Sequence, residues 1–287
     1  MFDFRYHALS LTAVIVALVL GVLLGVAIGD RNLVSSGEKA IRNDLRHAIS
    51  SAQNHADELQ GKLNDRKDVL DGVSSLLVDG QLAGRSVGVV FLGPKSNTDN
   101  GYISKALKAS GGNAAWVIAL KEPLDTKAVA GNAEGTQYAN LGGDDPTLYG
   151  KLGLRVGTQL VQGGKLIQNE RSSLSDSFDG KLAPVQTIVL IRDTPSDLDP
   201  ADKPNVDAFE KGVVAGLQQP GAVVVGAQTE ATTPSQTSWY DDQGLTYISD
   251  LDEVEGQISL IYALNGSQGR FGHGVHEQVL PSIAGNG

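Results

Sequence analysis

The sequence predicts an α/β protein with an N-terminal transmembrane helix, a coiled-coil stalk and a Rossmann-like, mostly parallel three-layer domain. Three observations lead to this prediction. Residues 9–28 form an uncharged apolar run, residues 41–77 carry apolar side chains spaced by three and four, and short valine- and isoleucine-rich runs alternate with helical stretches from residue 85 onward. The expected parts are a tail and membrane helix over 1–30, a stalk over 31–80 and a domain over 85–287.

The membrane helix is predicted from length and polarity. Between Leu9 and Ile28 the only polar residues are Ser10 and Thr12. A helix rises about 1.5 Å per residue, so this run covers the hydrocarbon core of a bilayer, which is about 30 Å thick. A cleaved signal peptide is the nearest alternative, but its apolar region usually has only about 7–15 residues. We therefore expect an uncleaved anchor.

Every fourth residue along one face of this predicted helix is small. Two overlapping G-x-x-x-G units lie on that face, and such units let a second helix backbone approach closely. The sequence predicts that the span packs against another helix, either its own copy or a partner's. The expected packing residues are Ala13, Ala17, Gly21, Gly25 and Gly29.

Charge and cysteine content exclude several functions. The chain carries a net charge of −10 and has no cysteine. An acidic protein is repelled by phosphate backbones, so nucleic-acid binding is not expected. The lack of cysteine excludes a disulfide framework, a thiolate metal site and a cysteine nucleophile.

The charges beside the span leave its orientation open. Arg5 precedes the span, whereas Arg31, Lys39, Arg42 and Arg46 follow it. The positive-inside rule, taken literally, places the large domain in the cytoplasm. Large domains are translocated largely regardless of charge, however, so the rule does not decide the matter here.

Beyond the span, the apolar spacing predicts a helix that runs to about Leu77 and forms a coiled coil. Alanines in the seam weaken such a coil, so we expect the span and the stalk to form a homodimer together. The alternative is a helix that lies against its own domain. The expected seam residues are Ile41, Leu45, Ala52, Leu59, Leu63, Leu70 and Val73.

From residue 85 onward the pattern is that of a doubly wound domain. Unbroken apolar runs at 86–93, 113–120, 185–193 and 221–228 are typical of strands buried on both faces of a parallel sheet. The stretches 101–110, 148–162 and 206–219 between them are expected to be helices. A fifth strand within 244–251 and a closing helix over 253–266 complete the prediction.

The domain lacks a nucleotide fingerprint. The loop after the first strand, residues 93–101, is neither G-x-G-x-x-G nor a Walker loop, although Glu122 follows the second strand, where a ribose-binding acid lies in dinucleotide-binding folds. We therefore expect no nucleotide. Any other ligand would bind beyond the carboxyl ends of the strands, where the strand order reverses. The candidate crevice residues are Lys95, Ser96, Asn97, Asp193 and Asp197.

The aspartate-rich loop over 192–202 has two interpretations. Its carboxylates could bind Ca²⁺, or they form a solvated loop with helix-capping aspartates. His273 and His276 also have two interpretations: a Zn²⁺ or Cu²⁺ site, or a surface pair. Copper(I) prefers sulfur ligands, and Met1 is the only sulfur-containing residue. No catalytic motif is present, so we do not expect an enzyme.

Two segments of the chain resemble a known family. The start, MFDFRYHALSLTAVIVALVLGVLLGVAIGD, strongly resembles that of the actinobacterial MctB-like family, described as copper transport outer membrane proteins. The segment YALNGSQGRFGHG…VLP is similar to that family's end. With the stalk and α/β domain between them, the resemblance covers nearly the whole chain.

The resemblance implies a single-pass protein of the cell membrane, with its large domain outside the cytoplasm in the cell envelope, and a role in copper efflux or resistance. A cell-division relative called SteB is also similar. It implies a dimeric partner of the membrane protein SteA that acts in cell separation and in control of a peptidoglycan hydrolase. No metal-ligand motif of the family maps onto this sequence, so the resemblance assigns no site residue.

Two functions of different classes follow as hypotheses. The first is a non-catalytic dimeric scaffold without a cofactor, which binds envelope and cell-division proteins. The second is copper homeostasis, with efflux of copper across the cell envelope. A solute-binding or enzymatic domain is a third possibility, and it requires a ligand in the crevice.

Overall fold

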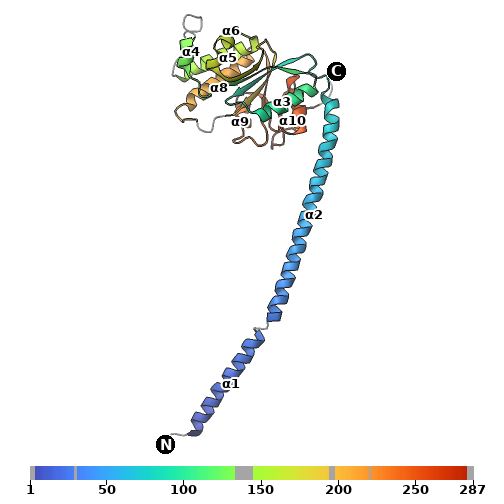
Figure 1. Cartoon of the computed structure of the whole chain (residues 1–287), viewed down its shortest axis with the longest axis vertical. Coiled ribbons are helices and arrows are strands. Elements are labelled where there is room, and N and C mark those ends of the chain that lie inside the picture. Colours follow the sequence, from blue (N-terminus) through green and yellow to red (C-terminus); the bar gives the residue numbers. More distant parts are fainter. Residues whose placement is uncertain (1–3, 29–30, 133–144, 194–197, 220, 283–287) are drawn as a thin grey trace. The chain divides into compact units, whose positions relative to one another are not determined.

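The computed structural model describes residues 4–28, 31–132, 145–193, 198–219 and 221–282. The chain divides into two compact units, Met1–Arg66 and Lys67–Gly287. Two long helices, α1 (Phe4–Ile28) and α2 (Arg31–Val78), precede the α/β domain, and α2 ends inside the second unit (Figure 1).

Helix α1 confirms the predicted apolar N-terminal helix. Its stretch Leu9–Ala27 has a mean hydropathy of 2.8, is not buried, and is long and apolar enough to cross a membrane. Gly29 lies outside the described residues. The packing of α1 against another helix stays a prediction. The described members of the small-residue face are all exposed: Ala13, Ala17, Gly21 and Gly25.

Helix α2 ends at Val78, one residue beyond the predicted end. In the first unit its predicted seam residues are exposed, with 69% of Ile41 and 59% of Leu45 accessible. Ala52, Leu59 and Leu63 are exposed as well. The helix is therefore confirmed, whereas the coiled coil and the dimer stay predictions.

The last turns of α2 belong to the same compact unit as the α/β domain. Leu70 and Leu77 pack against the domain's hydrophobic core, and Val78 is buried in it. The hydroxyl of Tyr262 also donates a hydrogen bond to the carbonyl of Leu77 at 3.0 Å. Leu70 is thus partly buried against its own domain, whereas Val73 is exposed; pairing of these residues with a second copy stays a prediction.

Within the described residues, seven strands form one sheet in the order β3-β2-β1-β4-β5-β6-β7. Neighbouring strands run parallel, except that β3 is antiparallel to β2. This confirms the predicted mixed α/β class and the mostly parallel sheet. The strands are β1 (Ser86–Leu92), β2 (Asn113–Leu120), β3 (Ser175–Gly180), β4 (Thr187–Arg192), β5 (Val223–Ala227), β6 (Thr246–Ile248) and β7 (Arg270–Phe271).

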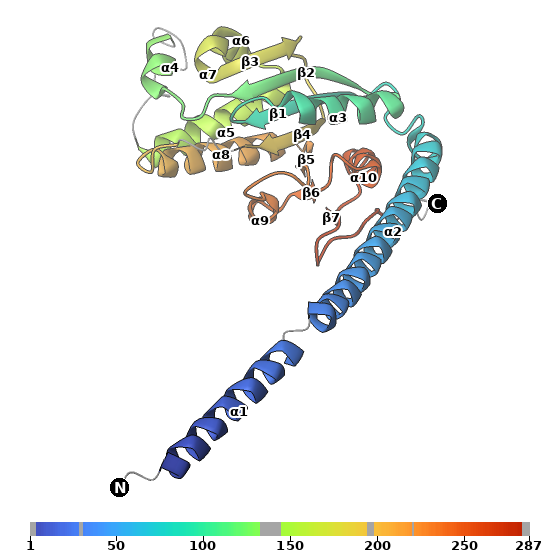
Figure 2. The ribbon, with the colours of Figure 1, turned by 60° about the horizontal axis from the view of Figure 1, so that its bottom comes forward.

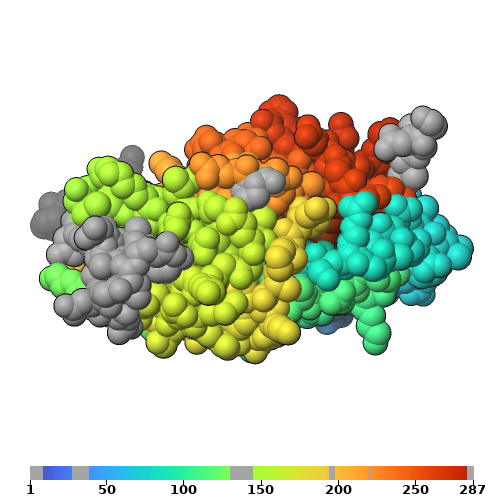
Figure 3. All heavy atoms as spheres, turned by 90° about the horizontal axis from the view of Figure 1, so that it is seen from above, coloured from blue at the N-terminus to red at the C-terminus, as the bar shows by residue number. Residues whose placement is uncertain are grey.

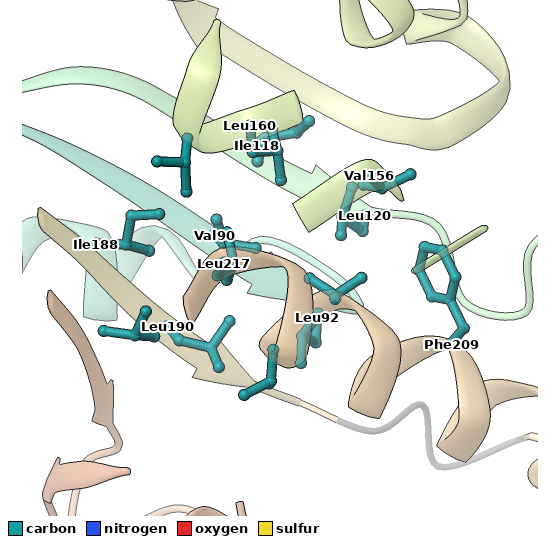
Figure 4. Packing of buried hydrophobic residues seen from close by; sticks show 14 of the residues in the cluster. Val90, Leu92, Ile118, Leu120, Val156, Leu160, Ile188, Leu190, Phe209 and Leu217 are labelled. Carbon is teal, nitrogen blue, oxygen red and sulfur yellow. The ribbon is translucent and has the colours of Figure 1, made fainter. Parts of the chain in front are cut away.

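Helices cover both faces of this sheet (Figure 2). Successive side chains of a strand point to opposite faces. Val90 and Leu92 of β1 accordingly join the core under α5 and α8 (Figure 4), whereas Val89 and Phe91 join the core under α3 and α10. The helices of the domain are α3 (Asn97–Ala109), α4 (Thr126–Asn132), α5 (Pro146–Gln162), α6 (Lys165–Asn169), α7 (Arg171–Leu174), α8 (Lys203–Gln218), α9 (Thr237–Asp242) and α10 (Val254–Leu264).

Capping residues explain why α5 begins earlier than the apolar pattern predicts. The side chain of Asp145 accepts a hydrogen bond from the backbone N–H of Thr147 at 2.7 Å, and Pro146 occupies the first turn of α5. Pro suits this position because its missing N–H would have no partner there. Helix α5 therefore starts at Pro146, two residues before the predicted start.

Helices α5 and α8 contact each other through their backbones. A Cβ added at Gly153 or Gly157 would collide with carbonyl groups of α8, and one added at Gly212 or Gly216 would collide with carbonyl groups of α5. Each helix therefore supplies a glycine wherever the other approaches most closely.

In the space-filling view of Figure 3, the segment from α5 to β3, in yellow-green and yellow, covers much of the face of the domain that this view shows.

Candidate functional site at the carboxyl edge of the sheet

The strand order reverses at β1, which pairs with β2 on one side and β4 on the other. In doubly wound sheets, ligands bind beyond the carboxyl ends of the strands at such a point. We call the side of the sheet where β1, β2, β4, β5 and β6 end the carboxyl edge. The backbone N–H of Asp193 donates to the carbonyl of Leu92 at 2.9 Å, so the ends of β1 and β4 are joined there.

The predicted crevice residues take separate roles at this edge. Ser96 is the N-cap of α3 and accepts a hydrogen bond from the backbone N–H of Asp99 at 3.2 Å, and Asn97 begins that helix. Lys95 forms an ion pair with Asp179 of β3. The backbone carbonyl of Asp193 lies against Gly93, where a side chain would collide with it. Asp197 lies outside the described residues.

A buried ion pair at the end of β4 is the centre of the site. The Nε and Nη2 atoms of Arg192 donate to the two carboxylate oxygens of Glu210 in α8, at 2.8 and 2.9 Å. The side chain of Glu210 has no exposed area, and that of Arg192 is 11% exposed. Nη1 of Arg192 donates to Oε1 of Gln236, and its guanidinium lies 4.9 Å from the ring centre of Trp239.

Tyr240 and Gln228 connect this ion pair to the end of β5. The hydroxyl of Tyr240 is fully buried, donates to the carbonyl of Ala227 at 2.9 Å and accepts from the backbone N–H of Arg192 at 3.0 Å. Burial raises the pKa of this hydroxyl, so it stays protonated. The side chain of Gln228 accepts a hydrogen bond from the backbone N–H of Gln236 at 2.6 Å. These contacts hold α9 against the carboxyl edge.

Glu122, at the end of β2, adds a second buried carboxyl group. Its two carboxyl oxygens are buried and have no hydrogen-bond partner among the described residues. Burial raises the pKa of this carboxyl well above its ordinary value, the charge of Glu210 adds to the rise, and Arg192 opposes it. Arg192 donates its side-chain hydrogen bonds to Glu210 rather than to Glu122, so burial favours the protonated form of the Glu122 carboxyl.

The Glu122→Gln variant should change how the stability of the fold depends on pH. Folding raises the pKa of Glu122, so the contribution of this side chain to the free energy of unfolding is complete below about pH 4, the ordinary range of glutamate. That contribution is lost as the pH rises through the raised pKa that Glu122 has in the folded protein. Glutamine removes this loss. Urea unfolding should therefore show a larger gain in stability over the parent at pH 8 than at pH 5. Glu230→Gln, which neutralises an exposed carboxylate, is the control, and equal gains at both pH values would contradict the prediction.

The two histidines of the sequence pattern lie beyond the end of β7. Nδ1 of His273 is 2.8 Å from Oδ2 of Asp250, which follows β6, and His276 is exposed. The described residues contain no group of three or more His, Cys, Asp or Glu side chains arranged to hold a metal ion. Calcium binding by the loop over 192–202 stays a prediction, because part of that loop lies outside the described residues.

Sequence reasoning missed Arg192, Glu210, Gln236 and Asp250. One signal was available for Glu210. It lies three or four residues from Val206, Val213 and Val214, so it is on the apolar face of its helix, where a charge needs a partner. Arg192 directly follows the apolar run of its strand, but the pairing of the two residues depends on the tertiary fold.

A family profile and several curated proteins are similar to this chain. The family profile described as "Copper transport outer membrane protein, MctB" matches residues 1–281. Proteins named "Copper transporter MctB" from Mycobacterium tuberculosis and Mycobacterium bovis are 32% identical over 123 residues. The aligned segment covers 42% of this chain and 38% of each relative.

One solved structure that matches part of this chain is PH0766 from Pyrococcus horikoshii. Its TM-score is 0.33 at 12% sequence identity, and the match covers 67% of this chain and 39% of that one. The family profile, by contrast, extends over nearly the whole sequence, from the apolar helix to the turn that contains His273 and His276. The chain therefore belongs to the MctB family of copper transport outer membrane proteins.

Proposed function

We propose that this chain is a membrane-anchored protein of the cell envelope that acts in copper homeostasis. The match of the family profile to residues 1–281 carries the proposal. The apolar stretch Leu9–Ala27 supplies a membrane anchor, and the domain lies on the outer side of that membrane. Because one helix cannot enclose a pore, the chain acts as a binding accessory to copper efflux rather than as the channel itself.

A second candidate function is a dimeric, non-catalytic scaffold for envelope proteins. The exposed apolar side chains of α2 favour it, because Ile41, Leu45 and Leu59 are all more than half exposed in the described structure. Such a helix gains its stability by packing its apolar face. Two copies that are anchored in the same membrane by their N-terminal helices run parallel to each other. Their α2 helices can then pair as a parallel heptad coiled coil.

The partners of such a scaffold are proposed from the SteB resemblance alone: a SteA-like membrane protein and a peptidoglycan hydrolase. In this function the α/β domain is the part that contacts other proteins, and α2 holds two copies together. Cell separation, rather than copper tolerance, then depends on the chain.

One set of strains tests both candidates. The gene is deleted and replaced by the parent, by a variant with Leu45→Asp and Leu59→Asp, or by a control with Ser50→Asp and Asn64→Asp on the other side of α2. Copper sensitivity of the deletion strain that the parent gene reverses supports the copper function, and unchanged growth in copper contradicts it.

The same strains report on the scaffold. Unseparated cells after deletion, restored by the parent and the control but not by the seam variant, support this function. The seam variant should also lose the crosslinked dimer from intact membranes. A parent chain that crosslinks neither to itself nor to another envelope protein contradicts the scaffold, whatever the copper result.

A further inference from the structure

A hollow beside the edge strand β3 is lined by two cationic side chains. It has a volume of about 320 Å³, and its lining comes from α6, α7, β3 and the two residues that follow β3. Figure 2 shows α6 and α7 next to β3 at this edge of the sheet. The cations are Arg171 and Lys181, and none of the described lining residues is acidic, although the chain carries a net charge of −10.

Arg171, at the start of α7, is held in place without an acid. Its Nη2 donates to the backbone carbonyl of Phe178 at 2.6 Å, and the carbon of its guanidinium lies 4.3 Å from the centre of the Phe178 ring. A guanidinium has five N–H donors in a planar fork. The other side-chain donors of Arg171 have no partner among the described residues, so a fixed cation with free donors faces this hollow.

The edge of β3 adds a backbone donor. The Phe178 carbonyl that Arg171 binds faces the open edge of the strand, and within a strand the N–H of the same residue points to the same side. β3 pairs with β2 alone among the described strands. The side chain of Lys181, directly beyond the end of β3, is exposed and forms no ion pair with a described residue. The acid nearest to it in sequence, Asp179, is paired with Lys95.

The rest of the lining is apolar. Ile167 of α6 is 1% exposed, and Phe178 and Leu182 are half-buried. A binding site for an organic molecule typically combines such an apolar lining with a few placed polar groups, in a volume of about 300–1,000 Å³. This hollow thus has an apolar part and a cationic part.

We propose that this hollow binds a carboxylate carried on an apolar body. The planar fork of Arg171 matches the two oxygens of a carboxylate, and Lys181 adds a second positive charge. The side chains of Ile167, Phe178 and Leu182 contact the apolar body. The inference depends on neither of the proposed functions, because neither assigns a role to this edge of the sheet.

Two sources present this chemistry: a free organic acid and the C-terminal end of a polypeptide. The test titrates the full chain in lipid nanodiscs by isothermal titration calorimetry, with empty nanodiscs as the blank. Benzoate should bind. Benzamide, which has the same ring without the charge, and acetate, which has the charge without the ring, should each bind at least about tenfold more weakly.

A fourth probe identifies the source of the carboxylate. It is the peptide acetyl-Gly-Ser-Phe with a free C-terminal carboxylate, whose backbone can also pair with the open edge of β3. Binding at least tenfold tighter than that of benzoate identifies a polypeptide end as the ligand. Equal or weaker binding of the peptide, with benzoate bound, identifies a free organic acid.

The main variant is Arg171→Gln, since its side-chain amide keeps a donor for the Phe178 carbonyl and removes the charge. We expect it to lower the affinity for benzoate at least about tenfold. Lys181→Gln should lower it about threefold, because an exposed ammonium contributes less. The control is Lys151→Gln, which removes an exposed charge of α5 outside the hollow and should leave the affinity unchanged.

Circular dichroism shows whether each variant is folded. The site is overturned if benzoate binds no more tightly than benzamide, or if folded Arg171→Gln binds benzoate as the parent does. If Arg171→Gln does not fold, an unchanged affinity of Lys181→Gln overturns the proposal in its place. Because copper tolerance and cell separation are read in other experiments, failure here leaves both proposed functions standing.

Discussion

Glu210→Ala is expected to lower the free energy of unfolding of the α/β domain by about 3–5 kcal/mol. The variant leaves the Arg192 guanidinium buried without the carboxylate that accepts two of its hydrogen bonds, at 2.8 and 2.9 Å. A buried charge that loses its partner costs far more than an exposed one. Urea unfolding of the full chain, followed by tryptophan fluorescence, measures the loss, because Trp116 and Trp239 both lie in this domain.

Two companion variants separate the ion pair from a general loss of packing. Asp207 also approaches Arg192, at 3.8 Å, but its side chain is 39% exposed, so Asp207→Asn should cost less than about 1 kcal/mol. Replacing both partners, with Arg192→Met and Glu210→Leu, removes the two charges together and should restore most of the stability. A loss for Glu210→Ala no larger than that for Asp207→Asn would contradict the prediction.

The ion pair also explains why two buried acids can lie at one edge of the sheet. One guanidinium neutralises one carboxylate, and its two-pronged contact with Glu210 assigns the charge there. Burial without a cation of its own favours the protonated form of Glu122, because a second unpaired charge in the same buried region would be costly.

The sequence predicted those strands that are buried on both faces. The runs at 86–93, 113–120, 185–193 and 221–228 each contain the strand that the structure shows, because a parallel strand covered by helices on both sides is apolar at most positions. Strand β3 was not predicted. Its residues SDSFDG show neither a continuous apolar run nor an alternation of apolar and polar side chains. The strand lies at the edge of the sheet, where it pairs with β2.

The candidate site was predicted less completely, for a physical reason. Glu122 could be singled out because its place after the second strand is a property of local sequence order. The partners of Arg192 lie 18 and 44 residues away along the chain. Such distant contacts depend on how α8 and α9 pack, and no local spacing encodes that packing.

The contact between α5 and α8 could have been noticed in the sequence. Each helix carries glycines four residues apart, at 153 and 157 in α5 and at 212 and 216 in α8. Glycine weakens a helix interior by about 1 kcal/mol relative to alanine, so repeated glycines on one helix face indicate that something else occupies the space of their side chains. In this domain the facing helix backbone occupies that space.

Gly216→Ala should therefore lower the free energy of unfolding by about 3 kcal/mol, at the upper end of the usual cost of overpacking. The new methyl group would collide with the backbone carbonyl of Leu154, and a backbone carbonyl cannot rotate away as a flexible side chain can. To accommodate the methyl group, α5 and α8 must separate along the whole contact. The apolar side chains between them, such as Val156 and Val213, then lose packing.

Gly101→Ala is the matched control, because it makes the same change inside α3, where the added Cβ meets no atom within 4 Å in the described structure. There alanine should raise the stability by about 0.5–1 kcal/mol through its better helix propensity. The two variants should thus change the free energy of unfolding in opposite directions, although the substitution is identical. If Gly216→Ala were as stable as Gly101→Ala in urea, the two helices could not be in backbone contact, and the glycines of α5 and α8 would need another explanation.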